Sequence, residues 1–390
     1  MRPRVLLVAN TSWYLKNFRL PLAHRLRANG FDPVFLAPDQ AQFEFLRALG
    51  FRCEAYPLRR GALAPWHALH TTLALARIYR RERPLLIHHF TITCVLLGGC
   101  AARLAGAPRV VGAITGLGHL FLAQNAKARF ARTLALPTLQ RIFRAKWHRV
   151  IFQNRDDLLR LLPGWHPGKL LGYVSEIPTS GVDIRYFRPG ALSGSRNPKR
   201  ILFVGRLLKE KGCRELIRAL ELLRERGVFF EASIVGSPDP GNPSSLKPEE
   251  LAHWAAIPGV TMHGHLEDVR EEMAKAALLV LPSYREGGSK VILEASAMAL
   301  PIVTTDVPGC RNLVVEGETG SLVPAGESAP LARAIEWLLD HPAEALTRGE
   351  NGRRFVEERF SDEVICSQTL SVYRSFPGVV FSPEVAEVES

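Results

Sequence analysis

The sequence predicts an α/β protein of two domains, each built on a parallel β-sheet, and three observations carry this prediction. At 390 residues the chain is longer than one ordinary hydrophobic core supports. Short apolar segments alternate with amphipathic ones in both halves, as in parallel sheets whose strands are joined by helices. Between the halves, Pro189-Gly190 leads into the polar stretch 193–199, which has the composition of a linker.

In the first half, strands are expected to alternate with helices. The strands are predicted over 5–9, 33–37, 85–88, 109–114 and 149–153, and the helices over 20–28, 42–49 and 126–147. The apolar stretch 85–107 contains two histidines and an arginine. It is therefore interpreted as a strand followed by a core helix, because a membrane span needs about 20 largely apolar residues.

In the second half the same alternation restarts. Strands are predicted over 201–204, 230–235, 278–281 and 301–304, with a helix over 214–226. The predicted domains are residues 1–188 and 189–360, followed by a C-terminal crossover segment and tail over 361–390. Two similar halves joined by one linker predict a cleft between them.

Composition narrows the class of protein and its compartment. The chain is 47% hydrophobic and 23% charged, which is typical of a globular protein. Its six cysteines form no Cys-x-x-Cys pair, so neither a zinc site nor a disulfide framework is indicated. The first apolar segment is only five residues long, too short for a signal peptide. A reducing cytoplasm fits these features best.

Charge is distributed unevenly along the chain. Residues 1–188 hold 28 Lys and Arg against 9 Asp and Glu, whereas residues 189–390 hold 22 against 29. No acidic residue occurs between Glu82 and Asp156. This gap predicts an anionic partner for the first domain. The alternative is a basic face that serves solubility alone.

The segment from Pro282 to Ala295 is the strongest candidate for a ligand site. An apolar strand runs into Glu286-Gly287-Gly288, and a helix then begins. Glycines allow close approach of a ligand to the backbone, and a helix N-terminus suits a phosphate. Glu286 before the turn and Glu294 inside the helix can accept hydrogen bonds from sugar hydroxyls. The alternative is a solvated surface turn with incidental acids.

Two further loops follow predicted strands. In the loop from Gly205 to Gly212, Arg206 and Lys211 are placed to contact a diphosphate, although basic loop residues are usually just solvated. The loop is not a P-loop, and no Gly-x-Gly-x-x-Gly follows the first strand. In the first half, the loop 115–119 places glycines at the carboxyl end of a strand, where open α/β sheets bind ligands. A tight turn explains it equally well.

Taken together, these motifs resemble the family 4 retaining glycosyltransferases, which have the two-domain GT-B fold. The resemblance covers nearly the whole chain. Its motifs are Gly181-Val182-Asp183, Phe187-Arg188-Pro189, Gly205-Arg206, Lys211-Gly212, Gly264, Pro282-Ser283, Glu286-Gly287, Glu294 of the Glu-x₇-Glu pattern, Pro308-Gly309, and Glu316 to Gly320.

The resemblance implies roles for these residues. Arg206 and Lys211 would contact the donor diphosphate and stabilise the leaving group, Glu286 would bind the transferred sugar, and Glu294 the ribose. The remaining donor-binding positions would be Gly205, Gly264, Gly287 and Gly288. The sequence departs from the family pattern at two places that affect these implied roles. Gly288-Ser289 replaces a bulky apolar residue and a proline, which affects the shape of the sugar pocket. Asn312 replaces a glutamate, which affects a contact at the cleft.

A finer resemblance concerns the acceptor. The segments Ile114 to Gly118 and His89-Phe90-Thr91 are similar to bacterial transferases acting on polyprenyl-diphosphate-linked sugars, among them N-acetylgalactosaminyltransferases that extend a bacillosamine-bearing carrier. This implies a lipid-linked glycan acceptor and a UDP-linked hexose or N-acetylhexosamine donor. The acceptor-side candidates are His89, Thr115, Gly116, Gly118 and His119.

A role at the membrane is expected from the basic interval. Apolar and basic residues interleave from Phe121 to Arg149, which predicts an interfacial helix at the anionic cytoplasmic leaflet. The alternative is an ordinary core helix with solvated cations. No Asp-x-Asp triplet is present, so a metal-independent reaction without a further cofactor is expected.

Two rival functions remain open. A hydrolysing sugar-nucleotide 2-epimerase has the same fold but needs no acceptor. A basic membrane or nucleic-acid adaptor would explain the charge, but the basic interval has no helix-turn-helix signature or aromatic-basic RNA motif, so no nucleic-acid partner is expected.

Overall fold

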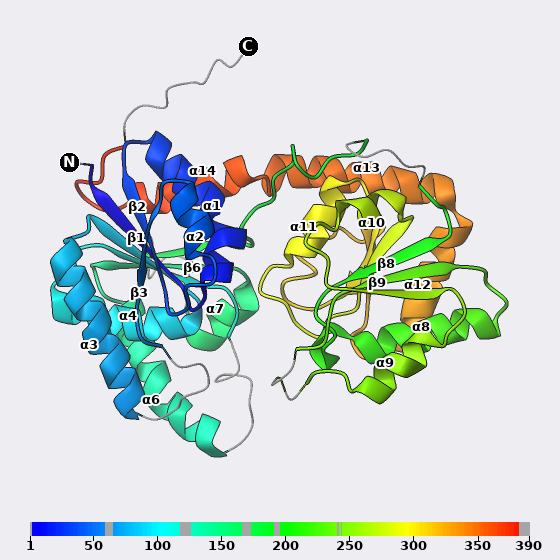
Figure 1. Cartoon of the computed structure of the whole chain (residues 1–390), viewed down its shortest axis with the longest axis horizontal. Coiled ribbons are helices and arrows are strands. Elements are labelled where there is room, and N and C mark those ends of the chain that lie inside the picture. Colours follow the sequence, from blue (N-terminus) through cyan, green and yellow to red (C-terminus); the bar gives the residue numbers. More distant parts are fainter. Residues whose placement is uncertain are drawn as a thin grey trace, which may run out of the picture. The chain divides into compact units, whose positions relative to one another are not determined.

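The computed structural model describes residues 2–58, 65–117, 126–165, 173–190, 196–239, 242 and 244–381. Its contacts divide the chain into two compact units (Figure 1). The first unit consists of residues 1–180 together with 365–390, and the second of residues 181–364.

The first unit is built on a seven-stranded parallel sheet. The strand order is β3-β2-β1-β4-β5-β6-β7. The strands are β1 (Arg4–Val8), β2 (Asp32–Ala37), β3 (Arg52–Ala55), β4 (Leu86–Phe90), β5 (Val110–Ile114), β6 (His148–Phe152) and β7 (Val174–Glu176). Strands β4, β5 and β6 are buried along their whole length, as expected when helices cover both faces of a parallel sheet.

Helices cover both faces of this sheet. They are α1 (Ser12–Ala28), α2 (Phe43–Ala48), α3 (Pro65–Glu82), α4 (Ile92–Ala105), α6 (Ala126–Phe143), α7 (Arg155–Leu161) and α14 (Asp362–Arg374). Because the crossovers between parallel strands are right-handed, α3, α4 and α6 lie on one face and α1 and α2 on the other. Figure 1 shows this arrangement.

The structure corrects the prediction of an interfacial helix over the basic interval. Leu139, Ile142 and Phe143 of α6 are buried in a core with residues of α4, β5 and β6, and Leu136 and Trp147 pack against it. Its 3.6-residue apolar period therefore marks a core face. Leu134 is exposed. Phe121 and the side chains of Lys127 and Phe130 lie outside the described residues.

The second unit has a six-stranded parallel sheet of order β10-β9-β8-β11-β12-β13. The strands are β8 (Arg200–Val204), β9 (Glu231–Val235), β10 (Val260–Gly264), β11 (Leu278–Leu281), β12 (Ile302–Thr305) and β13 (Gly320–Val323). The helices are η1 (Lys209–Lys211, 3₁₀), α8 (Cys213–Glu225), α9 (Pro248–Ala255), α10 (Arg270–Lys275), α11 (Lys290–Ala297), α12 (Ser328–Asp340) and α13 (Pro342–Arg359).

The chain passes into the second unit at Gly181, ahead of the predicted linker. Val182 N–H donates to the carbonyl oxygen of Phe360 over 3.1 Å. Arg353 on α13 donates to the backbone carbonyls of Ile184 and Phe187. These bonds tie the segment before Pro189 to the second unit, and the last helix, α14, returns to the first.

Most predicted elements are present within a few residues of their expected bounds. Helix α1 begins at Ser12, well before the predicted start, because Thr11 caps it by accepting from Tyr14 N–H over 3.1 Å. The stretch 85–107 is a strand and a core helix, as predicted. Among the helices that the structure describes, none combines the length and apolarity that crossing a membrane requires.

Candidate functional site

A cluster of polar side chains in the second unit lies where the strand order of its sheet reverses. The sheet continues from β8 to β9 on one side and to β11 on the other. In open parallel sheets, ligands bind at this reversal, outside the carboxyl ends of the strands. The loop after β8 carries Lys211 and the loop after β11 carries Glu286, so the fold brings these two predicted residues to the expected position.

Lys211 and Glu286 form an ion pair across the two loops. Lys211 Nζ lies 2.5 Å from Glu286 Oε1. Ser283 Oγ donates to the same oxygen over 2.7 Å. Lys211 and Glu286 are mostly shielded from solvent, with side chains 22% and 12% exposed. Because the pair is shielded, removing one partner should destabilise the protein more than removing one partner of an exposed pair would.

Two glycines let these loops approach each other. Gly212 has a φ of +68°, and a β-carbon there would come 1.9 Å from the carbonyl oxygen of Pro282. Gly309 has a φ of +79°, and its β-carbon would come 2.3 Å from the carbonyl oxygen of Glu286. Only glycine meets both conditions, the positive φ and the missing side chain.

The Gly287-Gly288 turn leads into the N-terminus of α11. Glu286 N–H donates to Pro308 O over 3.1 Å and Ser289 N–H donates to Gly309 O over 3.2 Å, which fixes the turn at both ends. Ser289 stands at the N-cap, but its side chain makes no capping hydrogen bond. A helix N-terminus without a side-chain cap suits an anion. The geometry is therefore compatible with the predicted phosphate contact.

Glu294 lies in the second turn of α11 and is half-buried. Burial raises the pKa of Glu294 to about 7; the nearby charge of Lys290 opposes the rise, and those of Asp268 and Asp362 add to it. A shielded carboxylate with a pKa of about 7 is suited to accept hydrogen bonds from ligand hydroxyls as it ionises.

Tyr186 and Asp268 lie within electrostatic reach of Glu294 and were not predicted. Burial raises the pKa of Tyr186, and the charges of Asp268 and Glu294 contribute to the rise. Tyr186 OH donates to Asp268 Oδ2 over 3.3 Å. The Arg270 guanidinium pairs with Asp268 and lies 3.6 Å from the centre of the Tyr186 ring. The sequence signal for Tyr186 is its position three residues after the Gly181–Asp183 motif.

Arg206 is held apart from the Lys211–Glu286 pair. Arg206 Nη1 lies 2.7 Å from Asp239 Oδ2, and the arginine side chain is 62% exposed. Two other predicted donor-side residues, Gly205 and Gly264, lie at the ends of strands and take part in backbone hydrogen bonds. Gly205 N–H donates to Val235 O, and Gly264 O accepts from Gly236 N–H over 2.7 Å. Arg206 and Lys211 share one loop in the sequence, whereas the structure pairs each cation with a different carboxylate.

In the first unit, His89 is enclosed in the core. Its Nε2 lies 2.9 Å from Tyr79 OH, and Gly98 of α4 packs directly against the ring. Burial lowers the pKa of His89 to about 3. The neighbouring His88 faces the opposite side of the sheet, where Nδ1 lies 2.6 Å from Tyr373 OH. We therefore assign His89 to core packing and not to an acceptor contact.

The other acceptor-side candidates follow β5. Thr115 and Gly116 are partly exposed at the carboxyl end of that strand, and Gly116 has a φ of +128°. Gly118 and His119 lie outside the described residues. At the end of the adjacent β4, Thr91 has a φ of +72°, unusual for a residue with a β-carbon. Such strain is found often at functional sites.

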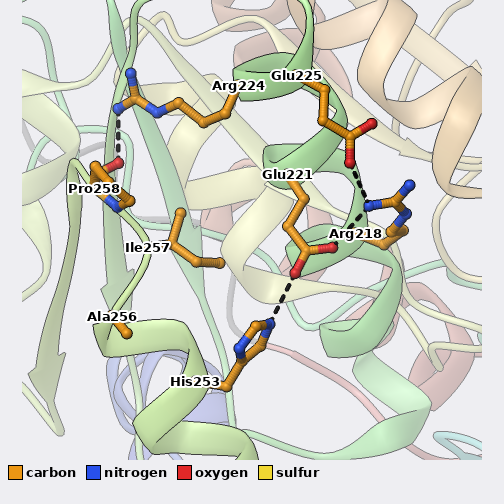
Figure 2. A pocket seen from close by; sticks show the side chains of 8 residues that line it. All are labelled: Arg218, Glu221, Arg224, Glu225, His253, Ala256, Ile257 and Pro258. Carbon is orange, nitrogen blue, oxygen red and sulfur yellow. Dashed lines mark hydrogen bonds and ion pairs between the residues drawn. The ribbon is translucent and has the colours of Figure 1, made fainter.

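A shallow groove of about 470 Å³ lies between α8 and the end of α9. Figure 2 shows Glu221 between Arg218 and His253, which it contacts at 3.0 and 2.8 Å. None of the predicted donor residues lines this groove. Its ion pairs are exposed, which favours a solvated surface. In the described part of the chain, no three His, Cys, Asp or Glu side chains are grouped to hold a metal ion.

Comparison with known families gives two matches. Residues 4–154 match the family described as Glycosyl transferase 4-like. Residues 198–341 match the family described as Glycosyl transferases group 1. The first match falls in the first unit and the second in the unit that carries the Lys211–Glu286 pair.

Relatives of known name are similar along most of their length. The capsular polysaccharide biosynthesis glycosyltransferase CapM of Staphylococcus aureus is 26% identical over 333 residues, which cover 82% of this chain and 84% of CapM. The N,N'-diacetylbacillosaminyl-diphospho-undecaprenol alpha-1,3-N-acetylgalactosaminyltransferase of Campylobacter jejuni is 25% identical over 370 residues, which cover 92% and 94%.

The fold also matches a solved structure. Sucrose-phosphate synthase from Thermosynechococcus elongatus superposes with a TM-score of 0.76 at 21% identity, over 96% of this chain and 98% of that one. The predicted fold, two Rossmann-like domains of the GT-B type, is confirmed by this likeness and by the two parallel sheets.

Proposed function

Because the chain belongs to the group 1 glycosyltransferases with a family 4-like first domain, we propose that it transfers a hexose or N-acetylhexosamine from a UDP-sugar to a glycan on a polyprenyl diphosphate. Glycosyl transfer itself follows from the family and fold. The observation that best supports the proposed donor site is the Lys211–Glu286 pair at the strand reversal, beside the N-terminus of α11.

The donor phosphates bind at the Gly287-Gly288 turn in this proposal. The uncapped N-terminus of α11 supplies backbone N–H groups and the positive end of the helix dipole. Glu294, one to two turns further along, accepts hydrogen bonds from the ribose hydroxyls. Its pKa of about 7 means that it is about half ionised at neutral pH and becomes a stronger acceptor as it ionises.

Lys211 and Glu286 exchange partners when the donor enters. Lys211 turns from the Glu286 carboxylate to the diphosphate, where its charge offsets the charge that develops on the leaving group. Glu286, still held by Ser283 Oγ, accepts hydrogen bonds from hydroxyls of the transferred sugar. Arg206 leaves Asp239 and joins the diphosphate, for which its exposure gives it freedom. No metal ion is required for this charge balance.

We propose that the donor linkage is retained, as the resemblance implies. In the described ranges, no carboxylate is assigned as a covalent nucleophile, because Glu286 is held by Ser283 Oγ and accepts hydrogen bonds from hydroxyls of the transferred sugar. The acceptor hydroxyl then attacks on the face that the diphosphate leaves, and a diphosphate oxygen takes the hydroxyl proton. The products are the glycosylated acceptor and the protonated nucleoside diphosphate, so atoms and charge balance.

The proposed acceptor is a lipid-linked glycan. The Campylobacter relative is named for a diphospho-undecaprenol acceptor, and its similarity extends over 92% of this chain. CapM is named for capsular polysaccharide biosynthesis. The acceptor would meet Thr115, Gly116 and Thr91 at the carboxyl ends of β5 and β4. A carrier lipid of this kind places the enzyme at the inner face of the plasma membrane.

A donor panel tests the proposal. The protein is incubated with UDP-, GDP- and ADP-linked sugars, with and without a polyprenyl-diphosphate glycan in detergent, and nucleoside diphosphate release is measured. Release with a UDP-sugar that depends on the acceptor supports the proposal. If nucleoside diphosphate and free sugar are released when no acceptor is present, the protein is a 2-epimerase instead. Failure of every donor to react or bind would favour the adaptor.

A further inference from the structure

Arg19 of α1 is a buried cation that no carboxylate neutralises in the part of the chain that the structure describes. The residue is only 5% exposed. Its Nη2 donates to Tyr14 OH over 2.6 Å, whereas its buried Nε has no hydrogen-bond partner among the described residues. A buried charge is costly unless it is paired, and an arginine does not lose its proton to avoid that cost. The guanidinium therefore keeps the capacity to bind an anion.

The groups that surround this guanidinium are neutral. Its Cζ lies 4.3 Å from the centre of the Phe90 ring, at the end of β4, and 5.4 Å from that of the Tyr14 ring. Burial lowers the pKa of His88 well below its usual range, and the charge of Arg19 lowers it further. Burial raises the pKa of Tyr373 on α14, whose hydroxyl lies 2.6 Å from His88 Nδ1. Aromatic stacking offsets part of the cost of burying Arg19, but it supplies no counter-charge.

Arg19 is directed toward the edge of the first sheet at which ligands are expected. The strand order of this sheet reverses at β1, which lies between β2 and β4, and open parallel sheets bind ligands outside the carboxyl ends of the strands at such a reversal. Long side chains of a helix lean toward its N-terminus, and the bond to Tyr14, five residues earlier, shows that Arg19 does so. The N-terminus of α1 follows β1 and so lies at that carboxyl edge.

The helix that follows β4 begins at the same edge with unsatisfied backbone donors. Thr91, directly after Phe90, is the N-cap of α4 but makes no side-chain capping bond, and the first turn of α4 contains no acidic residue. The N-terminus of α1 differs, because Ser12 N–H donates to Asp39 Oδ2 over 2.9 Å. An uncapped helix N-terminus favours an anion, as the buried guanidinium does.

Aromatic side chains border Arg19 on the side of solvent. Trp13 is 55% exposed, and its ring lies edge-on to that of Phe18, with 5.4 Å between the ring centres. The Phe18 ring lies 4.9 Å from that of Tyr14, which is partly exposed. Rings in this position keep water from the guanidinium, and a contact between opposite charges is stronger where water is excluded. Tyr14 is the side chain that separates Arg19 from solvent.

We propose that Arg19 binds the diphosphate of the lipid-linked acceptor after Tyr14 yields its place on Nη2. The planar guanidinium donates paired N–H bonds to phosphate oxygens, which matches a diphosphate better than a point charge would. Phe90, on which Arg19 stacks, adjoins Thr91, which the proposed function gives to the acceptor. The identity of the ligand rests on that proposed function, whereas the anion site rests on Arg19 and its surroundings.

Calorimetry on the full chain tests the contact without any catalytic step. A glycan on a short polyprenyl diphosphate is titrated in detergent with no donor present. Arg19→Met should weaken binding by about ten- to hundredfold, the ratio for losing a hydrogen bond to a charged group. Arg19→Lys, which keeps the charge but not the paired donors, should fall between the two. Binding of UDP should be unchanged in both variants, because the proposed donor site lies in the second unit.

A second arginine of α1 provides the matched control. Arg27 stacks on the Phe51 ring at 3.7 Å and donates to Leu49 O over 2.9 Å, near the other end of the helix. Arg27→Met should leave acceptor binding unchanged. The thermal midpoint of Arg19→Met should equal or exceed that of the unchanged protein, because an unpaired buried charge is removed. A lower midpoint together with unchanged acceptor affinity would show that Arg19 only packs the core, and would overturn the proposal.

Inorganic pyrophosphate separates the anion site from the proposed reaction. It is titrated with UDP present to fill the donor site, and its binding should be lost in Arg19→Met. If the unchanged protein does not glycosylate the acceptor but still binds pyrophosphate through Arg19, the proposed function fails and the anion site stands. If binding of pyrophosphate depends on Arg19 but acceptor affinity does not, the site takes free phosphate and the acceptor contact is wrong. If acceptor turnover occurs and Arg19→Met changes neither affinity, the proposed function stands and this proposal fails.

Discussion

Lys211 Nζ and Glu286 Oε1 lie 2.5 Å apart although 75 residues separate them in the chain. The pair exists because β8 and β11 are neighbours in the sheet and because Gly212 packs on Pro282. A cation and a carboxylate that neutralise each other before the donor arrives can each take a new partner afterwards.

Replacing Lys211 should affect the chemical step. If its charge offsets the leaving group, the gain is larger in the transition state than in the bound donor. Lys211→Met should therefore lower kcat by about 10²-fold or more, measured as nucleoside diphosphate release at saturating donor. A variant with a higher KM and an unchanged kcat would mean that Lys211 only holds the donor.

Arg206 should behave in the same way despite its different partner in this structure. Arg206→Gln should lower kcat by about 10²-fold. Asp239→Asn, which removes the carboxylate 2.7 Å from Arg206, serves as the control and should not reduce kcat. If both variants lost activity equally, the Arg206–Asp239 pair would be a structural contact and the proposed role of Arg206 would be wrong.

Glu294 should bind the nucleoside part of the donor. Glu294→Gln should weaken binding of the nucleoside diphosphate by roughly 1.5–3 kcal/mol, as for hydrogen bonds to a charged group, measured by calorimetry. A nucleoside without phosphates should bind the unchanged protein more weakly below pH 7, because protonation of Glu294 removes the charged acceptor. Unchanged affinity in the variant would contradict the assignment, whatever happened to turnover.

The raised pKa of Glu294 also predicts a change in stability with pH. Its folded-state value of about 7 exceeds the ordinary 4.5, so the folded protein holds this proton more tightly. The free energy of unfolding therefore falls progressively as the pH rises from 4.5 to about 7, and the full loss is reached above pH 7. Glu294→Gln removes this loss, so it should raise the free energy of unfolding by up to about 3 kcal/mol at pH 8. Its thermal midpoint should exceed that of the unchanged protein at pH 8 and much less so at pH 5.

Gly212 and Gly227 form a matched pair for testing the contact between the loops. Both have positive φ, +68° and +75°, but a β-carbon on Gly227 would meet nothing within 4 Å. Gly227→Ala should cost about 1–2 kcal/mol through backbone strain alone. Gly212→Ala adds the clash with Pro282, so it should lower the thermal midpoint further and weaken donor binding. Equal effects would show that the close approach of the loops is unimportant.

The positions of the proposed donor-side residues could be predicted because they depend on local sequence. Lys211 and Glu286 each follow a strand and lie in a glycine-containing loop before a helix. Each is therefore at the carboxyl edge of the sheet, whatever the place of its strand in the strand order. Their pairing could not be predicted, since it depends on the order of the strands in the sheet. Tyr186 and Asp268 were missed for the same reason, because they approach Glu294 from separate loops.

The acceptor side shows the limit of pattern reasoning. Strand β4 is buried on both faces, so alternation does not reveal which of His88 and His89 faces which layer of helices. Both are in fact buried. In α6, interleaved apolar and basic residues fit a membrane face or a core face equally well. Only packing showed that Leu139, Ile142 and Phe143 face the core, whereas Trp66 and Leu69 of α3 are exposed.

The central claim, that the donor binds where β8 and β11 end, is tested most directly by hydrogen–deuterium exchange with and without nucleoside diphosphate. The account predicts slower exchange in peptides covering 205–212 and 282–297, because the ligand orders both loops and the N-terminus of α11. Peptides 218–225 and 253–258, which border the groove of Figure 2, should be unchanged. Protection confined to that groove, with the two loops unaffected, would contradict the account.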